Sequence, residues 1–197
     1  MLGLRYDTPE GWASRALEDP GALLLDHLFC ERKAAAMALS LLGSHGAEHP
    51  RLDKLMHDLA EEENDHAAQV ERFLKAYPNV RREKGGNEYA RALRRHIGVD
   101  GNNDYLDLLL VCGLIEARSA ERFRLLAKEA RGSPLGGFYE DLYASEVSHY
   151  LLFLALGVDT AGEPRAVERL EELRTFEAGL IRSLPCGSRI HSGPPVR

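Results

Sequence analysis

The feature that most constrains the fold of this chain is an internal repeat. Residues 23–35, LLLDHLFCERKAA, align with residues 108–120, LLLVCGLIEARSA, at an offset of 85 and place Glu31 on Glu116. A Glu-x-x-His sequence follows each glutamate, after 32 residues in the first half (63–66) and after 30 residues in the second half (146–149). The two halves therefore look like duplicates of one helical unit.

The spacing of these residues predicts a metal site. Residues three apart on a helix project from one face, so each Glu-x-x-His can offer a carboxylate and an imidazole to a common centre. One further glutamate from each remaining helix completes a set whose four carboxylates offset the charge of two divalent ions about 4 Å apart. The predicted metal ligands, which are also the catalytic candidates, are Glu31, Glu63, His66, Glu116, Glu146 and His149. Two imidazoles with oxygen ligands and no thiolate favour iron or manganese over a closed zinc site, and both metals stay open.

Other acidic and histidine side chains compete for these roles. A single Glu-x-x-His is common by chance in a chain this rich in glutamate. The hypothesis of a metal site therefore depends on the matching positions of the two motifs in the repeat, and not on their presence alone. Glu62 lies one turn before the first histidine, but the repeat aligns Glu63 with Glu146, so Glu61 and Glu62 are expected to be solvated. Glu121 and His27 remain lesser alternatives as ligands.

Capping residues and helical periodicity predict the elements of the chain. Four long helices are expected, from Gly21 to Leu42 with a stop at Gly43, from Pro50 to Tyr77-Pro78, from Asn103-Asp104 to about Ala130, and from Ser133-Pro134 to about Leu156-Gly157. A short helix capped at Thr8-Pro9 precedes them, and a last helix spans Glu163 to Ser183. Strand signals are weak, because Val and Ile are sparse and no run alternates with period two. We therefore predict an all-α, ferritin-like four-helix bundle with additional short N-terminal, crossover and C-terminal helices, in a single domain of residues 1–197.

The segment from residue 81 to 101 connects the two halves and is polar and basic. A short helix from about Asn87 to His96 is expected within it, as part of a crossover and not of the core. Between Arg72 and His96 there are eight Lys/Arg against two Glu, although the whole chain has a net charge of −6. The candidate nucleic-acid contacts are Arg81, Arg82, Lys84, Arg91, Arg94 and Arg95. The alternative is a solvated charged loop.

The cysteines, the hydropathy and the N-terminal charges indicate where in the cell the protein is expected to act. Cys30, Cys112 and Cys186 form no CxxC pair, so we expect free thiols and neither a disulfide framework nor a structural zinc site. No apolar run approaches the roughly 18 residues that a membrane-spanning helix needs. Asp7 and Glu10 stand where a signal peptide would be basic and then apolar, so the expected location is cytoplasmic, without a membrane partner.

Several strings extend the pattern beyond a general ferritin-like protein. They are Asp26-His27, residues 30–35 (CERKAA), Glu62-Glu63 to His66, residues 115–123 (IEARSAERF), Phe138-Tyr139, Ser145-Glu146 to His149, and residues 190–193 (IHSG). Together they resemble the MiaE family of tRNA hydroxylases, from about Leu23 to Gly193. The Glu-Ala-Arg-Ser stretch and the His-Ser-Gly tail are the specific parts of the resemblance.

The resemblance implies a non-haem di-iron monooxygenase that uses O2 to hydroxylate the isopentenyl group of 2-methylthio-N6-isopentenyladenosine beside the tRNA anticodon. The six predicted ligands would hold two irons, and a reductase or ferredoxin would supply two electrons. Leu28, Phe29 and Leu114 are candidates for a pocket around the isoprenoid chain, with core packing as the more ordinary role. Two rival functions stay open, a ferritin-like iron-storage or peroxide-scavenging protein and a metal-free helical interaction protein.

Overall fold

The computed structural model describes residues 2–81, 88–98 and 104–195. All regular structure in these ranges is helical, which confirms the all-α prediction. The contacts divide the chain into two compact units, one of residues 19–84 and one of residues 1–18 with 85–197. The expectation of a single domain stays a prediction.

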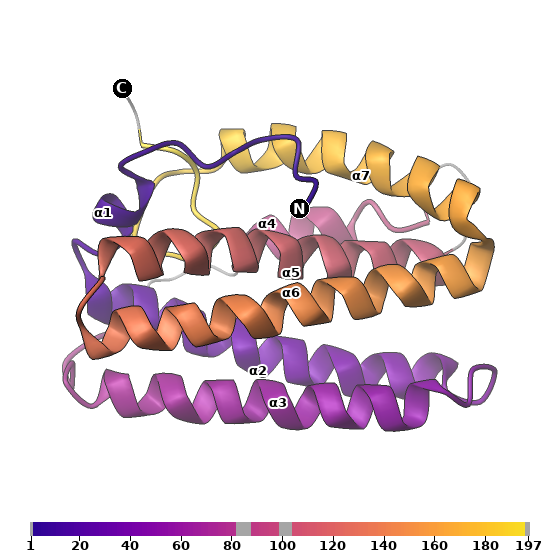
Figure 1. Ribbon diagram of the computed structural model, residues 1–197, viewed down its shortest axis with the longest axis horizontal. Coiled ribbons are helices and arrows are strands. Elements are labelled where there is room, and N and C mark those ends of the chain that lie inside the picture. The colour runs from indigo at the N-terminus through magenta and orange to yellow at the C-terminus, as the bar shows by residue number, and fades with distance from the viewer. Residues whose placement is uncertain (1, 82–87, 99–103, 196–197) are drawn as a thin grey trace. The chain divides into compact units, whose positions relative to one another are not determined.

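The unit of residues 19–84 is a helical hairpin of α2 (Pro20–His45) and α3 (Leu52–Leu74), which lie side by side in Figure 1. Asp19 caps α2 as predicted, because its carboxylate accepts a hydrogen bond of 2.9 Å from the backbone N–H of Ala22 and Pro20 follows at the first helical position. The predicted stop at Gly43 is wrong. The helix continues to His45, since one glycine inside a helix costs only about 1 kcal/mol and buried Leu41 anchors the preceding turn.

The larger unit is built around α5 (Asp104–Glu129). This helix contacts α1 (Trp12–Ala16), α4 (Glu88–Arg94), α6 (Pro134–Ala161) and α7 (Glu163–Ser183). Figure 1 shows α5 and α6 as a long pair with α7 along them. Because neighbours cover α5 on several sides, its buried residues lie all round the helix.

Two predicted helix boundaries in this unit are wrong because contacts with distant parts of the chain override the local sequence signal. Thr8 does not cap the first helix, because its N–H and hydroxyl instead donate to the Glu121 carboxylate at 2.7 and 2.6 Å; α1 begins at Trp12. Gly157 does not end α6. A Cβ there would come within 3.0 Å of the Leu110 side chain, so this glycine allows α5 and α6 to approach, and the helix ends before Gly162, which has a φ of +79°.

The segment around α4 was predicted to lie outside the core, and that prediction is also wrong. Tyr89 and Leu93 are buried and pack with Leu110, Leu114 and Leu173 of α5 and α7. The amphipathic character of α4 explains this, since its arginines lie on the opposite, exposed face. The remaining prediction, a last helix from Glu163 to Ser183, is confirmed.

Candidate metal centre

The first candidate half-site lies within the α2–α3 hairpin. Glu31 comes from α2, and Glu63 and His66 come from one face of α3, as residues three apart must. All three side chains are buried, and each offers a ligand atom within 4.8 Å of the others. The Nδ1 atom of His66 lies 3.5 Å from Oε2 of Glu31 and 3.7 Å from Oε2 of Glu63. The structure therefore brings these three predicted residues together.

The electrostatics of this half-site favour positive charge. Burial alone would raise the pKa of the Glu31 carboxyl, but the charge and hydrogen bond of His27, with the contacts to His66 and Glu63, hold that pKa well below its usual range. Burial lowers the pKa of the His66 imidazole, yet the two neighbouring carboxylates raise it to about 10. Both shifts arise from the attraction between the buried carboxylates and the imidazoles beside them, and the same carboxylates could attract a metal ion.

The second candidate half-site lies on α5 and α6, in the other unit. Glu116 comes from α5, and Glu146 and His149 come from one face of α6. Their ligand atoms lie within 4.8 Å of one another, and all three residues are 5% exposed or less. One turn before Glu116, burial and the charge of this glutamate raise the pKa of the Cys112 thiol to about 12. Beside this carboxylate the Cys112 thiol is therefore protonated at neutral pH.

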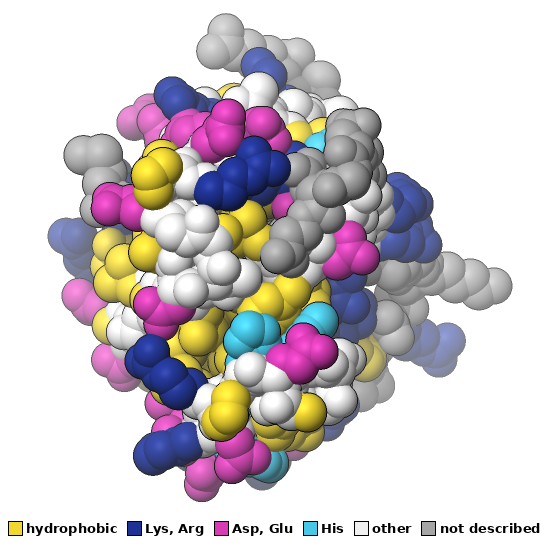
Figure 2. Space-filling model, turned by 90° about the vertical axis from the view of Figure 1, so that its right-hand side faces the viewer, with side chains coloured by type: hydrophobic (Ala, Val, Ile, Leu, Met, Phe, Trp, Pro, Cys, Tyr) yellow, Lys and Arg dark blue, Asp and Glu magenta, His cyan; other side chains and the backbone are white. Residues whose placement is uncertain are grey.

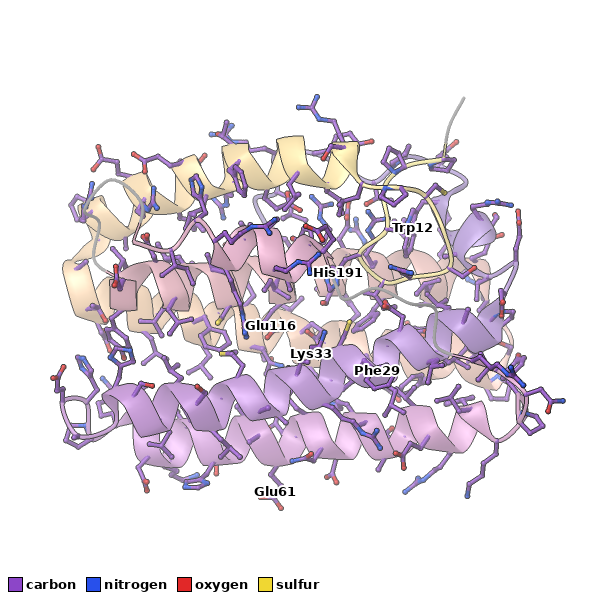
Figure 3. The ribbon with its side chains drawn as sticks, turned by 180° about the vertical axis from the view of Figure 1, so that it is seen from behind. Trp12, Phe29, Lys33, Glu61, Glu116 and His191 are labelled. Atoms are coloured by element: carbon purple, nitrogen blue, oxygen red, sulfur yellow. The ribbon has the colours of Figure 1, made fainter. Side chains whose placement is uncertain are left out.

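The competing acidic residues have other roles in the structure. Glu61 and Glu62 are exposed, as predicted, and Figure 3 shows Glu61 pointing outward from α3. Glu121 is buried, but its carboxylate binds Arg118 and Thr8. Because this ion pair already compensates its charge, Glu121 is a structural residue. The last competitor, His27, is buried beside Glu31.

The donor chemistry of both half-sites fits metal ions. Each half offers two carboxylates and one imidazole from buried side chains, a set that suits iron or manganese. Burying several carboxylates without compensating positive charge is costly, and a pair of divalent cations would offset that cost. Cys30, Cys112 and Cys186 all lie within the described residues, and none of them takes part in a disulfide bond.

The sequence did not reveal why the strings of residues 115–123 and 190–193 matter; in the structure they meet. Arg122 donates to the backbone oxygen of Ser192 at 3.0 Å, and the guanidinium lies 3.9 Å from the centroid of the Trp12 ring. The Ser119 hydroxyl lies 3.3 Å from Nε2 of His191. Figure 3 shows Trp12 beside the C-terminal segment that carries His191. The C-terminal segment of residues 190–193 is therefore a buried part of the larger unit and contacts α5, the helix that carries Glu116.

A second buried network joins α4, α5 and α7. Arg118 donates to both oxygens of Glu177 at 2.8 and 2.9 Å, and the Tyr89 hydroxyl donates to the same carboxylate at 3.0 Å. Arg169 pairs with Asp107 at 2.7 Å in the same unit. In the sequence, these ion pairs are indicated only by charged residues at helix positions where the periodicity predicts core residues.

The basic candidates are exposed where the structure describes them. Arg81 is exposed, and so are Arg91, Arg94 and Arg95 on or just after α4, while Arg82 and Lys84 lie outside the described residues. Glu88 pairs with both Arg91 and Arg95, which reduces the net charge of this group. Figure 2 shows one face of the molecule, where basic and acidic side chains both reach the surface.

Leu28, Phe29 and Leu114, the pocket candidates, differ in their surroundings. Leu114 is fully buried in the hydrophobic core of its unit, Leu28 is 5% exposed, and Phe29 is partly exposed. Leu114 therefore serves core packing. Among the helices that the described ranges contain, none has the length and apolar character to cross a membrane.

Comparison with known proteins gives a consistent result over the whole chain. A protein named tRNA 2-(methylsulfanyl)-N(6)-isopentenyladenosine(37) hydroxylase from Pseudomonas putida is 38% identical over 188 residues, covering 95% of this chain and 91% of the relative. A protein of the same name from Salmonella typhimurium is 28% identical, covering 98% of this chain and 88% of the relative.

A solved structure also matches nearly the full length. It is described as "Protein 43 with aldehyde deformylating oxygenase activity from Synechococcus", with a TM-score of 0.87, 34% identity, and coverage of 97% of this chain and 96% of that chain. This likeness confirms the predicted ferritin-like fold class. The family model described as tRNA-(MS[2]IO[6]A)-hydroxylase (MiaE) matches residues 2–192. The chain therefore belongs to the MiaE family.

Proposed function

We propose that this protein is a non-haem di-iron monooxygenase that hydroxylates the isopentenyl group of 2-methylthio-N6-isopentenyladenosine next to the tRNA anticodon. The observation that carries the proposal is the pair of buried half-sites, each with two carboxylates and one imidazole. Membership of the MiaE family and the shared name of the two curated relatives supply the substrate class.

In this proposal the six residues act together. Glu31, Glu63 and His66 from one half would hold the two irons jointly with Glu116, Glu146 and His149 from the other. Cleaving an unactivated C–H bond needs a stronger oxidant than any protein side chain. When bound, the metal pair would supply that oxidising power by activating O2. In this reaction one C–H bond, O2, two electrons and two protons are converted to one C–OH bond and one water molecule. The electrons would come from a reductase or a ferredoxin.

The protein's own residues would control access and geometry. The four carboxylates are at most 5% exposed, and the charge of a bound metal pair would stabilise their burial away from bulk water. The contacts of its two oxygens with His27 at 2.6 Å and with His66 at 3.5 Å would fix the orientation of Glu31. A target base in an anticodon loop is already partly unpaired, which lowers the cost of bringing it to a buried site. With a tRNA substrate, the proposed location of the protein is the cytoplasm.

The test is a mass measurement on tRNA. Reduced, iron-loaded protein is incubated with 18O2 and tRNA that carries the 2-methylthio-N6-isopentenyl modification, and the nucleosides are then analysed. We expect one 18O atom in the modified nucleoside, and none in tRNA that lacks the isopentenyl group. Absence of oxygen incorporation together with rapid peroxide turnover would contradict the proposal and favour a scavenging protein.

One specific observation supports a second candidate, aldehyde deformylation. The structural relative described with that activity is 34% identical and covers 97% of this chain. Long-chain aldehydes are therefore included as competing substrates in the same reaction. Conversion of aldehyde without oxygen transfer to tRNA would favour this candidate. Fewer than one iron or manganese per chain after anaerobic reconstitution would instead favour the metal-free interaction protein.

A further inference from the structure

His27 is a buried histidine that the predicted ligand set does not use. It lies one turn before Glu31 on the buried face of α2, and its side chain has no exposed surface. Its Nε2 atom is 2.6 Å from Oε1 of Glu31, within hydrogen-bond distance. The other oxygen of the same carboxylate, Oε2, faces Nδ1 of His66 at 3.5 Å. The two oxygens of Glu31 therefore face two different imidazoles.

The other half of the repeat has no such histidine. The offset of 85 that aligns Glu31 with Glu116 aligns His27 with Cys112. Cys112 is buried, and a thiol is only a weak hydrogen-bond donor, whereas an imidazole N–H is a strong one. The two equivalent glutamates thus have donors of different strength one turn before them. This difference breaks the symmetry of the duplicated site.

We propose that His27 is a positioning residue, which donates from Nε2 to Oε1 of Glu31 and leaves Oε2 to bind metal, so that the two metal positions are inequivalent. The inference rests on the proposed di-iron function. A group that hydrogen-bonds a metal ligand from outside fixes the orientation and basicity of that ligand, and its loss typically costs about 10- to 100-fold in metal affinity. The iron that Glu31 would help to hold would depend on His27, and the iron that Glu116 would help to hold would not.

The experiment compares matched variants of the full chain in anaerobic iron(II) titrations against a chelator and by 57Fe Mössbauer spectroscopy. His27→Leu removes the donor at similar volume, whereas His27→Gln retains an N–H donor. Cys112→Ser is the control at the equivalent position of the repeat. For His27→Leu we expect one of the two irons to bind about 10- to 100-fold more weakly and one of two quadrupole doublets to change. His27→Gln and Cys112→Ser should both keep two irons at nearly native affinity.

Two results would overturn the inference, namely two native-like irons in His27→Leu, or equal losses in His27→Leu and His27→Gln. If His27→Leu does not fold, 15N NMR of the zinc-loaded native protein determines whether Nε2 of His27 carries a proton or binds metal. A proton on Nε2 of His27 supports the inference, and a metal bond to that nitrogen contradicts it. Native protein that binds no iron would refute the proposed function itself, whereas native protein with two irons and unchanged His27 variants would refute only this inference.

Discussion

Burial separates Glu63 and Glu146 from the acidic residues beside them. Both side chains are at most 2% exposed, whereas Glu61 on the same helix as Glu63 is exposed. In the proposed function both buried carboxylates would hold the iron pair. Glu63→Ala or Glu146→Ala should therefore reduce bound iron to less than half of the native content, as measured by metal analysis after anaerobic reconstitution.

The matched control for these substitutions is Glu61→Ala, which removes the same charge from the surface of α3. It should retain native iron content. Full metal content in either Glu63→Ala or Glu146→Ala would refute the assignment of that residue, and iron loss in Glu61→Ala would point to a general effect of charge.

Arg118 forms a buried ion-pair network with Glu121 and Glu177 in the larger unit. Burial opposes its charge, but the hydrogen bonds and charge of Glu177, with Glu121 and Tyr89, raise its pKa above the ordinary value for arginine. Arg118→Met would leave two buried carboxylates without this partner. We expect the free energy of unfolding in urea to fall by about 3–5 kcal/mol.

The comparison for this prediction is Arg165→Met, which removes an exposed ion pair of 3.0 Å with Glu168. Exposed pairs contribute about 0–1 kcal/mol, so this variant should unfold almost like the native protein. A similar, small loss in both variants would show that the buried network adds little net stability.

At the level of the elements, the start of α6 depends on a close backbone approach. A Cβ on Gly136 would lie 2.3 Å from the backbone oxygen of Ala130, which cannot move as a flexible side chain could, whereas a Cβ on Gly137 would meet nothing within 4 Å. Gly136→Ala should therefore lower the free energy of unfolding by about 1–3 kcal/mol.

Gly137→Ala should have the opposite sign and raise the free energy of unfolding by up to about 1 kcal/mol, because alanine has the higher helix propensity. Urea unfolding of the two variants measures both effects. Equal effects at the two positions would contradict the close contact between the start of α6 and the end of α5.

For the whole molecule, charge distribution decides how an acidic protein could bind tRNA. The net charge of −6 gives no global attraction, so affinity must come from local basic residues such as those of the segment between the two halves. Replacing Arg81, Arg82 and Lys84 together by alanine should weaken tRNA binding and reduce the slope of log affinity against log salt by up to about 3 units. Bound iron should not change.

The control removes the same charge from exposed residues around the end of α5, by replacing Arg124, Lys128 and Arg131 with alanine. Its salt slope should remain native. If both triple variants lose the same affinity, binding depends on total charge, and an unchanged first variant would move the docking surface to Arg91, Arg94 and Arg95.

The presence of the long helices and the candidate ligands on them could be predicted from the sequence. Capping at Asp19 and Ser133 depends on residues within one helical turn, so local patterns predicted both starts correctly. Glu63 and His66 share a face of α3 for the same local reason, since the helical period fixes which residues project together. The repeat then distinguished Glu63 from its acidic neighbours.

The tertiary structure alone decided which partner each residue meets. Thr8 has the chemistry of a helix cap but binds Glu121, 113 residues away, and Gly157 resembles a helix stop but allows α5 and α6 to approach. The burial of Tyr89 and the close approach of His27 to one particular oxygen of Glu31 were equally hidden. Local periodicity specifies which face a side chain occupies, but contacts between distant segments depend on how whole helices pack, and no short stretch of sequence contains that information.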